Sequence, residues 1–140
     1  MRKNFRYLLL IVAITCLWVT SIAAQQSGES MLQPKHYGNI PYISGGIGLD
    51  EREALNSLAA GYNLKLMFAV PAGNYLADVR VEIRDASGQL MVDAVSEGPW
   101  FFAHLPPGRY NVSVNLAGAV QRQNVQVSGR GQTQLNFFWK

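Results

Sequence analysis

Two histidines, His36 and His104, are the residues best suited to metal binding or acid–base catalysis in this 140-residue chain. A hydrolytic zinc site needs a His and a Glu at a spacing that brings both onto one ion, with a further ligand elsewhere. Neither histidine has such neighbours in the sequence. The sequence therefore predicts no metal, no cofactor and no enzyme; a small hydrolase is the weakest alternative, because no cluster of titratable residues can be assembled for it.

Phosphate binding is the other chemistry that a short motif suggests. The segment Gly45-Gly46-Ile47-Gly48 stands directly before a predicted helix, and glycine-rich loops at helix N-termini can bind phosphate. No strand of a βαβ unit is expected before it, no Lys-Ser or Lys-Thr follows, and the carboxylates of Asp50, Glu51 and Glu53 would repel an anion. We expect a flexible entry to the helix and no nucleotide.

Residues 1–24 have the pattern of a secretory signal peptide. Arg2, Lys3 and Arg6 precede an apolar run of about 12 residues, from Leu8 to Val19, and small residues follow. A membrane anchor is the alternative, but spanning hydrocarbon takes about 20 apolar residues. We expect cleavage after Ala23 or Ala24, which also removes Cys16, and an exported protein, periplasmic or secreted, that meets the membrane only transiently through its signal peptide.

Charge and size place further limits on the exported chain. Loss of three of the 12 basic residues leaves nine, against nine Asp and Glu, so the mature protein is neutral. A neutral chain lacks the basic surface of a nucleic-acid-binding protein. About 116 residues can form one domain with its own core.

Three segments make up the predicted mature chain. Residues 25–48 are rich in Gln, Ser, Gly and Pro and are predicted to be a linker. A helix is predicted over about Glu51–Ala60, with Asp50 and Glu53 as its capping box and Gly61 as its C-terminal cap. Residues 49–140 then contain this helix and a mainly β domain.

Alternation of apolar and polar residues predicts seven strands after Gly61, separated by turn residues, as in a β-sandwich. They are Leu64–Val70, Val79–Asp85, Gln89–Val95, Trp100–His104, Tyr110–Leu116, Ala119–Val127 and Thr133–Trp139.

The same alternation assigns strand faces. Met67, Phe101 and Phe138 are expected to point outward as an apolar patch, which a monomer rarely leaves bare. Trp100 and Phe102 are expected inside the core. The helix, through Leu55 and Leu58, is the expected cover of the patch; the alternative is that Phe101, Phe138 and Met67 bind a partner.

Residues 79–114 carry a combined signature: two alternating strands joined by Asp85-Ala86-Ser87-Gly88, then Gly98, Trp100, Phe102, Leu105-Pro106-Pro107-Gly108, and Tyr110 opening a further strand. This pattern resembles the carboxypeptidase regulatory-like domain, which implies a seven-stranded transthyretin-like Greek-key β-sandwich with a carbohydrate-binding-like fold, preceded here by one short helix. Such domains are accessory modules, so the resemblance implies a fold rather than a reaction.

The resulting functional expectation is a non-catalytic exported binding or assembly module of the cell envelope, with an envelope protein or a glycan as its partner. The alternative is a structural or stability accessory subunit of a larger envelope machine, with residues 25–48 as its tether.

Overall fold

The computed structural model describes residues 32–73 and 76–140. The predicted signal peptide, its cleavage site and Cys16 lie outside these residues. The described chain contains one α-helix, one short 3-10 helix and nine strands. In chain order they are β1 (Lys35–Tyr37), β2 (Ile40–Gly45), α2 (Leu49–Leu58), η2 (Ala59–Gly61), β3 (Leu64–Ala69), β4 (Arg80–Asp85), β5 (Leu90–Val95), β6 (Trp100–Ala103), β7 (Gly108–Leu116), β8 (Ala119–Val127) and β9 (Thr133–Phe138).

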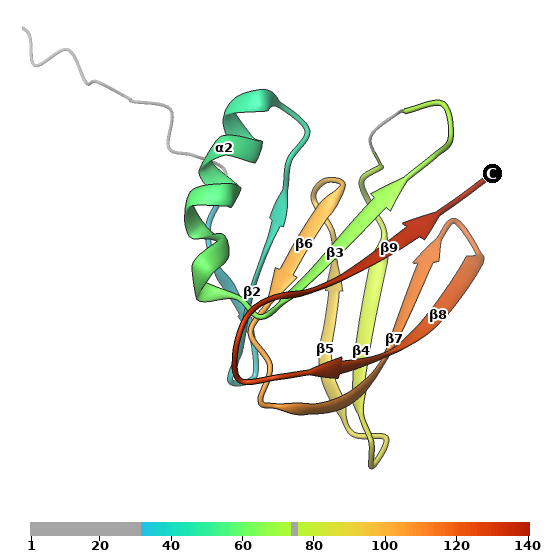
Figure 1. The fold of residues 1–140 in the computed structure, drawn as a ribbon. Coiled ribbons are helices and arrows are strands. Elements are labelled where there is room, and N and C mark those ends of the chain that lie inside the picture. The colour runs from blue at the N-terminus through green and yellow to red at the C-terminus, as the bar shows by residue number, and fades with distance from the viewer. Residues whose placement is uncertain (1–31, 74–75) are drawn as a thin grey trace, which may run out of the picture.

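The strands form two sheets, as Figure 1 shows. Sheet A has five strands in the order β1-β2-β6-β3-β9, and sheet B has four in the order β5-β4-β7-β8. All neighbouring pairs are antiparallel except β3 and β9, which run parallel. Strands far apart in the sequence therefore lie side by side within each sheet. The two sheets share one apolar core, which is the arrangement of a β-sandwich.

The main core lies between the two sheets. Sheet A contributes alternate side chains of β3 with Phe101 and Phe137, and sheet B contributes alternate side chains of β4, β5, β7 and β8. Leu64, Leu66 and Phe68 are almost completely buried, as the alternation predicted. Burying these large apolar side chains contributes on the order of 1.5–3 kcal/mol each.

Each of the seven predicted strand ranges corresponds to one of β3 to β9, but residues 32–73 and 76–140 together contain nine strands rather than seven. The two additional strands, β1 and β2, form a hairpin inside residues 25–48, where a linker was predicted. Gly38 takes a positive φ of 56° in the turn, and β2 then pairs with β6. The linker prediction is therefore wrong over residues 35–45.

Helix α2 lies on the outer face of sheet A beside β2 (Figure 1), and its Leu55 belongs to the same apolar cluster as Phe102 of β6. The predicted helix is confirmed, but its caps differ. Gly48 is the N-cap and makes no side-chain cap bond, while Glu51 Oε2 accepts hydrogen bonds from the backbone N–H groups of Gly46 and Ile47, at 2.9 and 3.2 Å. At the other end the helix passes into η2, and Tyr62 leaves in an extended conformation.

The Leu105-Pro106-Pro107-Gly108 turn connects the sheets at one end of the sandwich. The Tyr110 hydroxyl donates a hydrogen bond back to the carbonyl oxygen of Pro106. This local bond clamps the turn against the start of β7, in the manner of the tyrosine corners of other sandwiches. This hydrogen bond explains why a tyrosine, with its hydroxyl group, follows the proline turn at position 110.

Candidate functional site

The structure separates the three residues predicted to form an outward patch. Phe101 is fully buried, pairs in register with Leu66 and stacks on Tyr42 at a ring-centroid distance of 5.3 Å. Met67 is half-buried and Phe138 is 57 % exposed, both on the outer face of sheet A. The outward assignment of Phe101 is therefore wrong, and Phe101 cannot contribute to an exposed binding surface.

Trp100 and Phe102 occupy the outer face instead. Phe102 lies in a second apolar cluster with Leu32, Ile43 and Leu55, and Trp100 packs against this cluster while remaining half-buried. Helix α2 therefore does cover an apolar surface of the sheet, but the surface is that of Phe102 rather than the predicted patch. Leu58, the second residue expected to provide cover, is 42 % exposed.

The part of this outer face beside α2 stays open. In register, Trp100 of β6 adjoins Met67 of β3, and Met67 adjoins Asn136 of β9. Lys65 pairs with Gln134, and Ala69 pairs with Phe138. We call this surface the open strip. Its residues are Lys65, Met67, Trp100, Gln134, Asn136 and Phe138.

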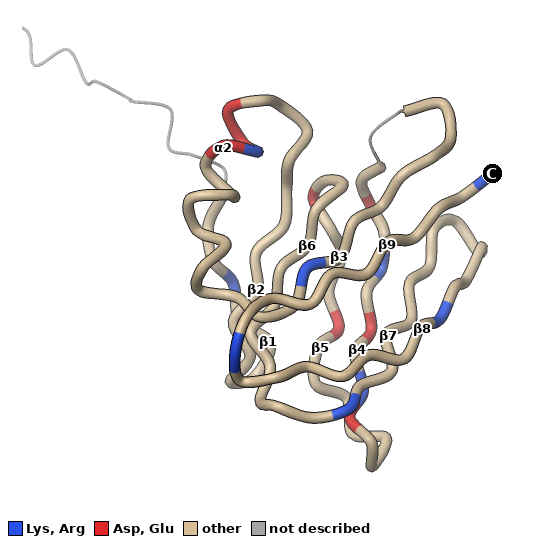
Figure 2. Tube along the Cα trace, viewed as in Figure 1, with Lys and Arg blue, Asp and Glu red and all other residues tan. Residues whose placement is uncertain are grey.

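The electrostatics of the open strip are set by one cation. The Lys65 Nζ atom lies 3.9 Å from the centre of the Trp100 ring and 5.4 Å from that of Phe102, which are cation–π distances. Burial lowers the pKa of Lys65 from its ordinary value. Lys65 is the only charged residue of β3, β6 and β9, so the strip carries no carboxylate, as Figure 2 illustrates.

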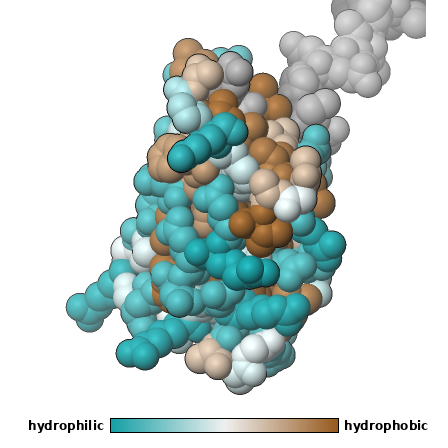
Figure 3. Space-filling model, turned by 90° about the vertical axis from the view of Figure 1, so that its right-hand side faces the viewer, coloured by the Kyte–Doolittle hydropathy of each residue, from teal (hydrophilic) through white to brown (hydrophobic). Residues whose placement is uncertain are grey.

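Amide side chains dominate the edge of the strip at β9. Gln134 Nε2 donates to Asn136 Oδ1 at 2.8 Å. From the opposite sheet, Gln121 and Gln123 donate to the backbone oxygens of Phe138 and Asn136, both at 2.8 Å. These bonds occupy acceptors that an edge strand would otherwise expose to another chain. Figure 3 shows this side of the molecule as mainly hydrophilic in its lower part, with apolar residues gathered higher up.

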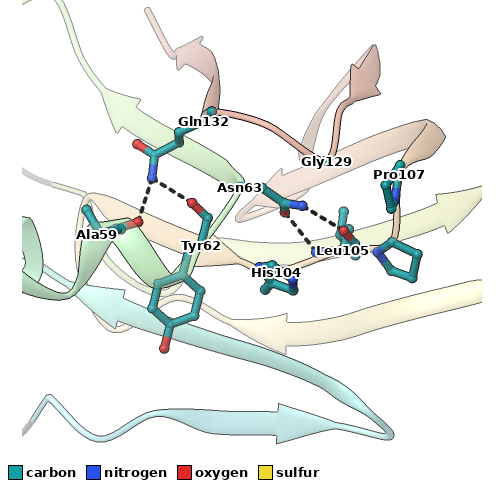
Figure 4. Close-up of a pocket in the computed structure, with 11 residues that line it drawn as sticks. Ala59, Tyr62, Asn63, His104, Leu105, Pro107, Gly129 and Gln132 are labelled. Carbon is teal, nitrogen blue, oxygen red and sulfur yellow. Dashed lines mark hydrogen bonds between the residues drawn. The ribbon is translucent and has the colours of Figure 1, made fainter.

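A separate pocket of about 490 Å³ lies at the end of the sandwich where three connections meet (Figure 4). Its walls are the segments Ala59–Asn63, His104–Pro107 and Gly129–Gln132. Gln132 Nε2 donates to the carbonyl oxygens of Ala59 and Tyr62, both at 3.1 Å, and so joins two of these walls. The pocket is therefore held by hydrogen bonds between loops.

Asn63 is the buried polar residue that holds this pocket together. Its Nδ2 donates to the carbonyl oxygen of Leu105 at 2.7 Å, and its Oδ1 accepts from the backbone N–H of Leu105 at 2.8 Å. Both polar atoms of the side chain are thus satisfied within the protein, and Asn63 has a structural rather than a ligand-binding role. Sequence reasoning did not single it out, because an Asn after a helix also fits an ordinary turn.

We expect Asn63→Ala to destabilise the fold by about 2–3 kcal/mol, because it leaves a buried N–H and a buried carbonyl of Leu105 without partners. Urea denaturation of the variant and the parent measures this difference. His104→Ala is the matched control: the side chain is exposed in the same pocket, so a change within about 0.5 kcal/mol is expected. Equal stability of Asn63→Ala and parent would contradict the structural role assigned to the two Asn63–Leu105 hydrogen bonds.

The described residues contain neither a group of potential metal ligands nor a helix that could span a membrane. Within residues 32–73 and 76–140, no three His, Cys, Asp or Glu side chains are grouped as metal ligands would be. Over the same ranges, no helix has the length and apolar character to cross a membrane.

The geometry thus presents an open strip of apolar and amide groups and a loop pocket whose buried amide is already satisfied. No model of a protein family matches the chain, and no curated protein sequence matches it either.

Proposed function

We propose that this protein is a non-catalytic binding module, exported to the cell envelope, whose open strip contacts a partner. The observation that carries the proposal is the exposure of Phe138, 57 %, beside the half-buried Met67 and Trp100 on a sheet face without carboxylates. Apolar rings flanked by amides can bind apolar faces and hydroxyl groups together.

The size of the open strip favours a narrow partner. Three strands spaced about 4.8 Å apart and three alternate side chains along β9 span roughly 10 by 14 Å. A stable protein interface buries on the order of 800 Å² per partner, several times this area. A glycan chain therefore suits the strip better than a large protein surface, although a protein partner could combine the strip with neighbouring regions.

For the fold, we propose membership of the carboxypeptidase regulatory-like group with a transthyretin-like Greek key. Counted from β3, the first strand lies between the fourth and the seventh, and the second lies between the third and the fifth. This order supports the resemblance, as does the bond between Tyr110 and Pro106 at the proline turn. Helix α2 and the β1–β2 hairpin are then additions to that sandwich.

Two substitutions test the proposed binding surface. Phe138→Ser and Met67→Ser should each weaken partner binding at least tenfold while changing stability little, because neither side chain lies in the main core. A glycan array and crosslinking in cells identify the partner class. Leu58→Ser, exposed on α2 outside the strip, is the control.

Unchanged binding in both strip variants would reject the strip as the binding surface. No ligand on the array and no crosslinked partner would favour the alternative, a stability accessory subunit of an envelope machine.

A further inference from the structure

Exposed large apolar side chains gather at one end of the sandwich. Among the described residues six are strongly exposed, and five of these lie at the end where β2, β3, β5 and β9 finish and α2 begins (Figure 1). We call these five the apolar rim: Ile47, Leu49, Val95, Val120 and Phe138. The sixth, Leu58, lies at the opposite end of α2.

Strand register places two of the rim residues, Val95 and Val120, at one level of sheet B. Across sheet B, Val95 pairs with Arg80, Arg80 with Asn115, and Asn115 with Val120. The two sheets are tied together at this level by Trp139, whose Nε1 donates to the carbonyl oxygen of Ala119 at 3.2 Å. Phe138 adjoins that contact on sheet A.

The segment that carries Ile47 and Leu49, the end of the β2–α2 loop and the first residue of α2, is held in place. Glu51 accepts hydrogen bonds from the backbone N–H groups of Gly46 and Ile47, and Arg52 donates its backbone N–H and its Nε to the carbonyl oxygen of Gly48. The side chains of Ile47 and Leu49 are nevertheless 53 % and 66 % exposed. The hydrogen-bonded start of α2 and the loop before it therefore present two aliphatic side chains to the surroundings.

The first described residue, Leu32, lies at the same end of the sandwich as the apolar rim. Leu32 packs in the cluster beneath α2, close to where a Cβ on Gly45 would lie. The apolar run Leu8–Val19 precedes it by twelve residues, which reach at most about 45 Å when extended. If the protein is exported as proposed, a membrane-held signal peptide would keep the rim end within about 45 Å of the bilayer.

We infer that the apolar rim docks this protein on the uncharged surface of a lipid bilayer, with the long axis of the strands directed away from it. The rim residues project from a loop, from the start of α2 and from the outer faces of both sheets, so a deformable surface can accommodate all of them, whereas one rigid protein groove would not. Insertion of apolar side chains to headgroup depth is a common means of peripheral binding.

The charged residues near the apolar rim favour an uncharged lipid surface over an anionic one. Asp50 and Glu51 flank the exposed leucine, and Arg80 is paired with Asp93 at 2.9 Å. Lys35 is likewise paired with Glu97. Arg52 lies in the first turn of α2, Arg122 lies near Val120, and Lys140 follows two residues after Phe138. Among the described residues of this end, cations and carboxylates are therefore mixed, and they do not form the polybasic patch that recruits anionic lipid. This membrane contact would persist after loss of the signal peptide. The rim shares Phe138 with the open strip, so the two surfaces are told apart by Leu49, which belongs to the rim alone, and Met67, which belongs to the strip alone.

The test uses the exported protein and flotation with phosphatidylcholine–phosphatidylethanolamine vesicles. We expect binding that survives 0.5 M salt, and at least a tenfold loss of bound fraction for Leu49→Ser. Leu58→Ser is the matched control, because it removes an exposed leucine from the other end of the same helix; its binding should equal that of the parent. Thermal melts of both variants verify that they fold.

Four results would overturn the inference: no flotation of the parent, binding only to vesicles with anionic lipid, equal losses in both variants, or self-association without vesicles that Leu49→Ser abolishes. The last result would assign the rim to contacts between copies of this chain. Because the strip variant Met67→Ser should float normally, a failed membrane test and a failed binding-module proposal are distinguishable.

Discussion

Phe101→Ala is expected to destabilise the protein by about 3–5 kcal/mol, the range for deleting a large buried aromatic side chain. Phe101 is 0 % exposed, lies in the core between the sheets and stacks on Tyr42. Trp100→Ala should cost less than Phe101→Ala, because the indole is half-buried on the outer face. Chemical denaturation of the two variants and the parent measures the ranking.

Phe138→Ala provides the control for this comparison, because an exposed phenylalanine of β9 should change stability by no more than about 0.5 kcal/mol. A loss for Trp100→Ala as large as that for Phe101→Ala would show that the two faces of β6 bury comparable apolar surface. A larger loss for Trp100→Ala would restore the face assignment that alternation predicted.

The strand positions could be predicted because their signals are local. The alternation in β3, β4 and β7 depends on residues close together in the chain, as does the proline turn before Tyr110. The structure has strands at the three predicted places and the turn between β6 and β7. Pairing partners were not predictable in the same way, since β3 lies beside β9, about seventy residues later in the sequence.

The faces of β6 could not be predicted from alternation. Its sequence, Trp-Phe-Phe-Ala, has no polar residue to mark a solvated side, because α2 covers one face and the core covers the other. A strand buried on both faces loses the period of two. Two of the three predicted patch residues, Met67 and Phe138, still share one face, because Lys65, Asn136 and other polar neighbours mark the open side of β3 and β9.

The β1–β2 hairpin was missed for a different reason. Residues 25–48 are rich in Gly, Ser and Pro, a composition that is typical of linkers and that obscures the local hairpin pattern. Tyr37-Gly38-Asn39-Ile40 contains a Gly-Asn pair between apolar residues, which is a hairpin signal. The structure has the turn there, with Gly38 at positive φ.

Gly98→Ala is expected to destabilise the protein by about 3 kcal/mol or more, because the added methyl group would meet backbone that has no room to move. A Cβ at Gly98 would lie 2.4 Å from the carbonyl oxygen of Gly45 and 2.8 Å from its Cα. Gly45 in turn lies against Leu32 and pairs with Trp100 at the end of β2. Gly98 therefore permits the crossing of β2 and the β5–β6 connection.

Gly61→Ala is the matched control for this substitution. No atom lies within 4 Å of the position of its Cβ, and its φ is not in the left-handed region, so equal or slightly higher stability is expected. Thermal and urea melts of the two alanine variants measure the contrast. If Gly98→Ala were as stable as Gly61→Ala, the hairpin of β1 and β2 could not be seated against the β5–β6 connection as described. Since α2 follows directly from β2, its position over Phe102 would then need revision as well.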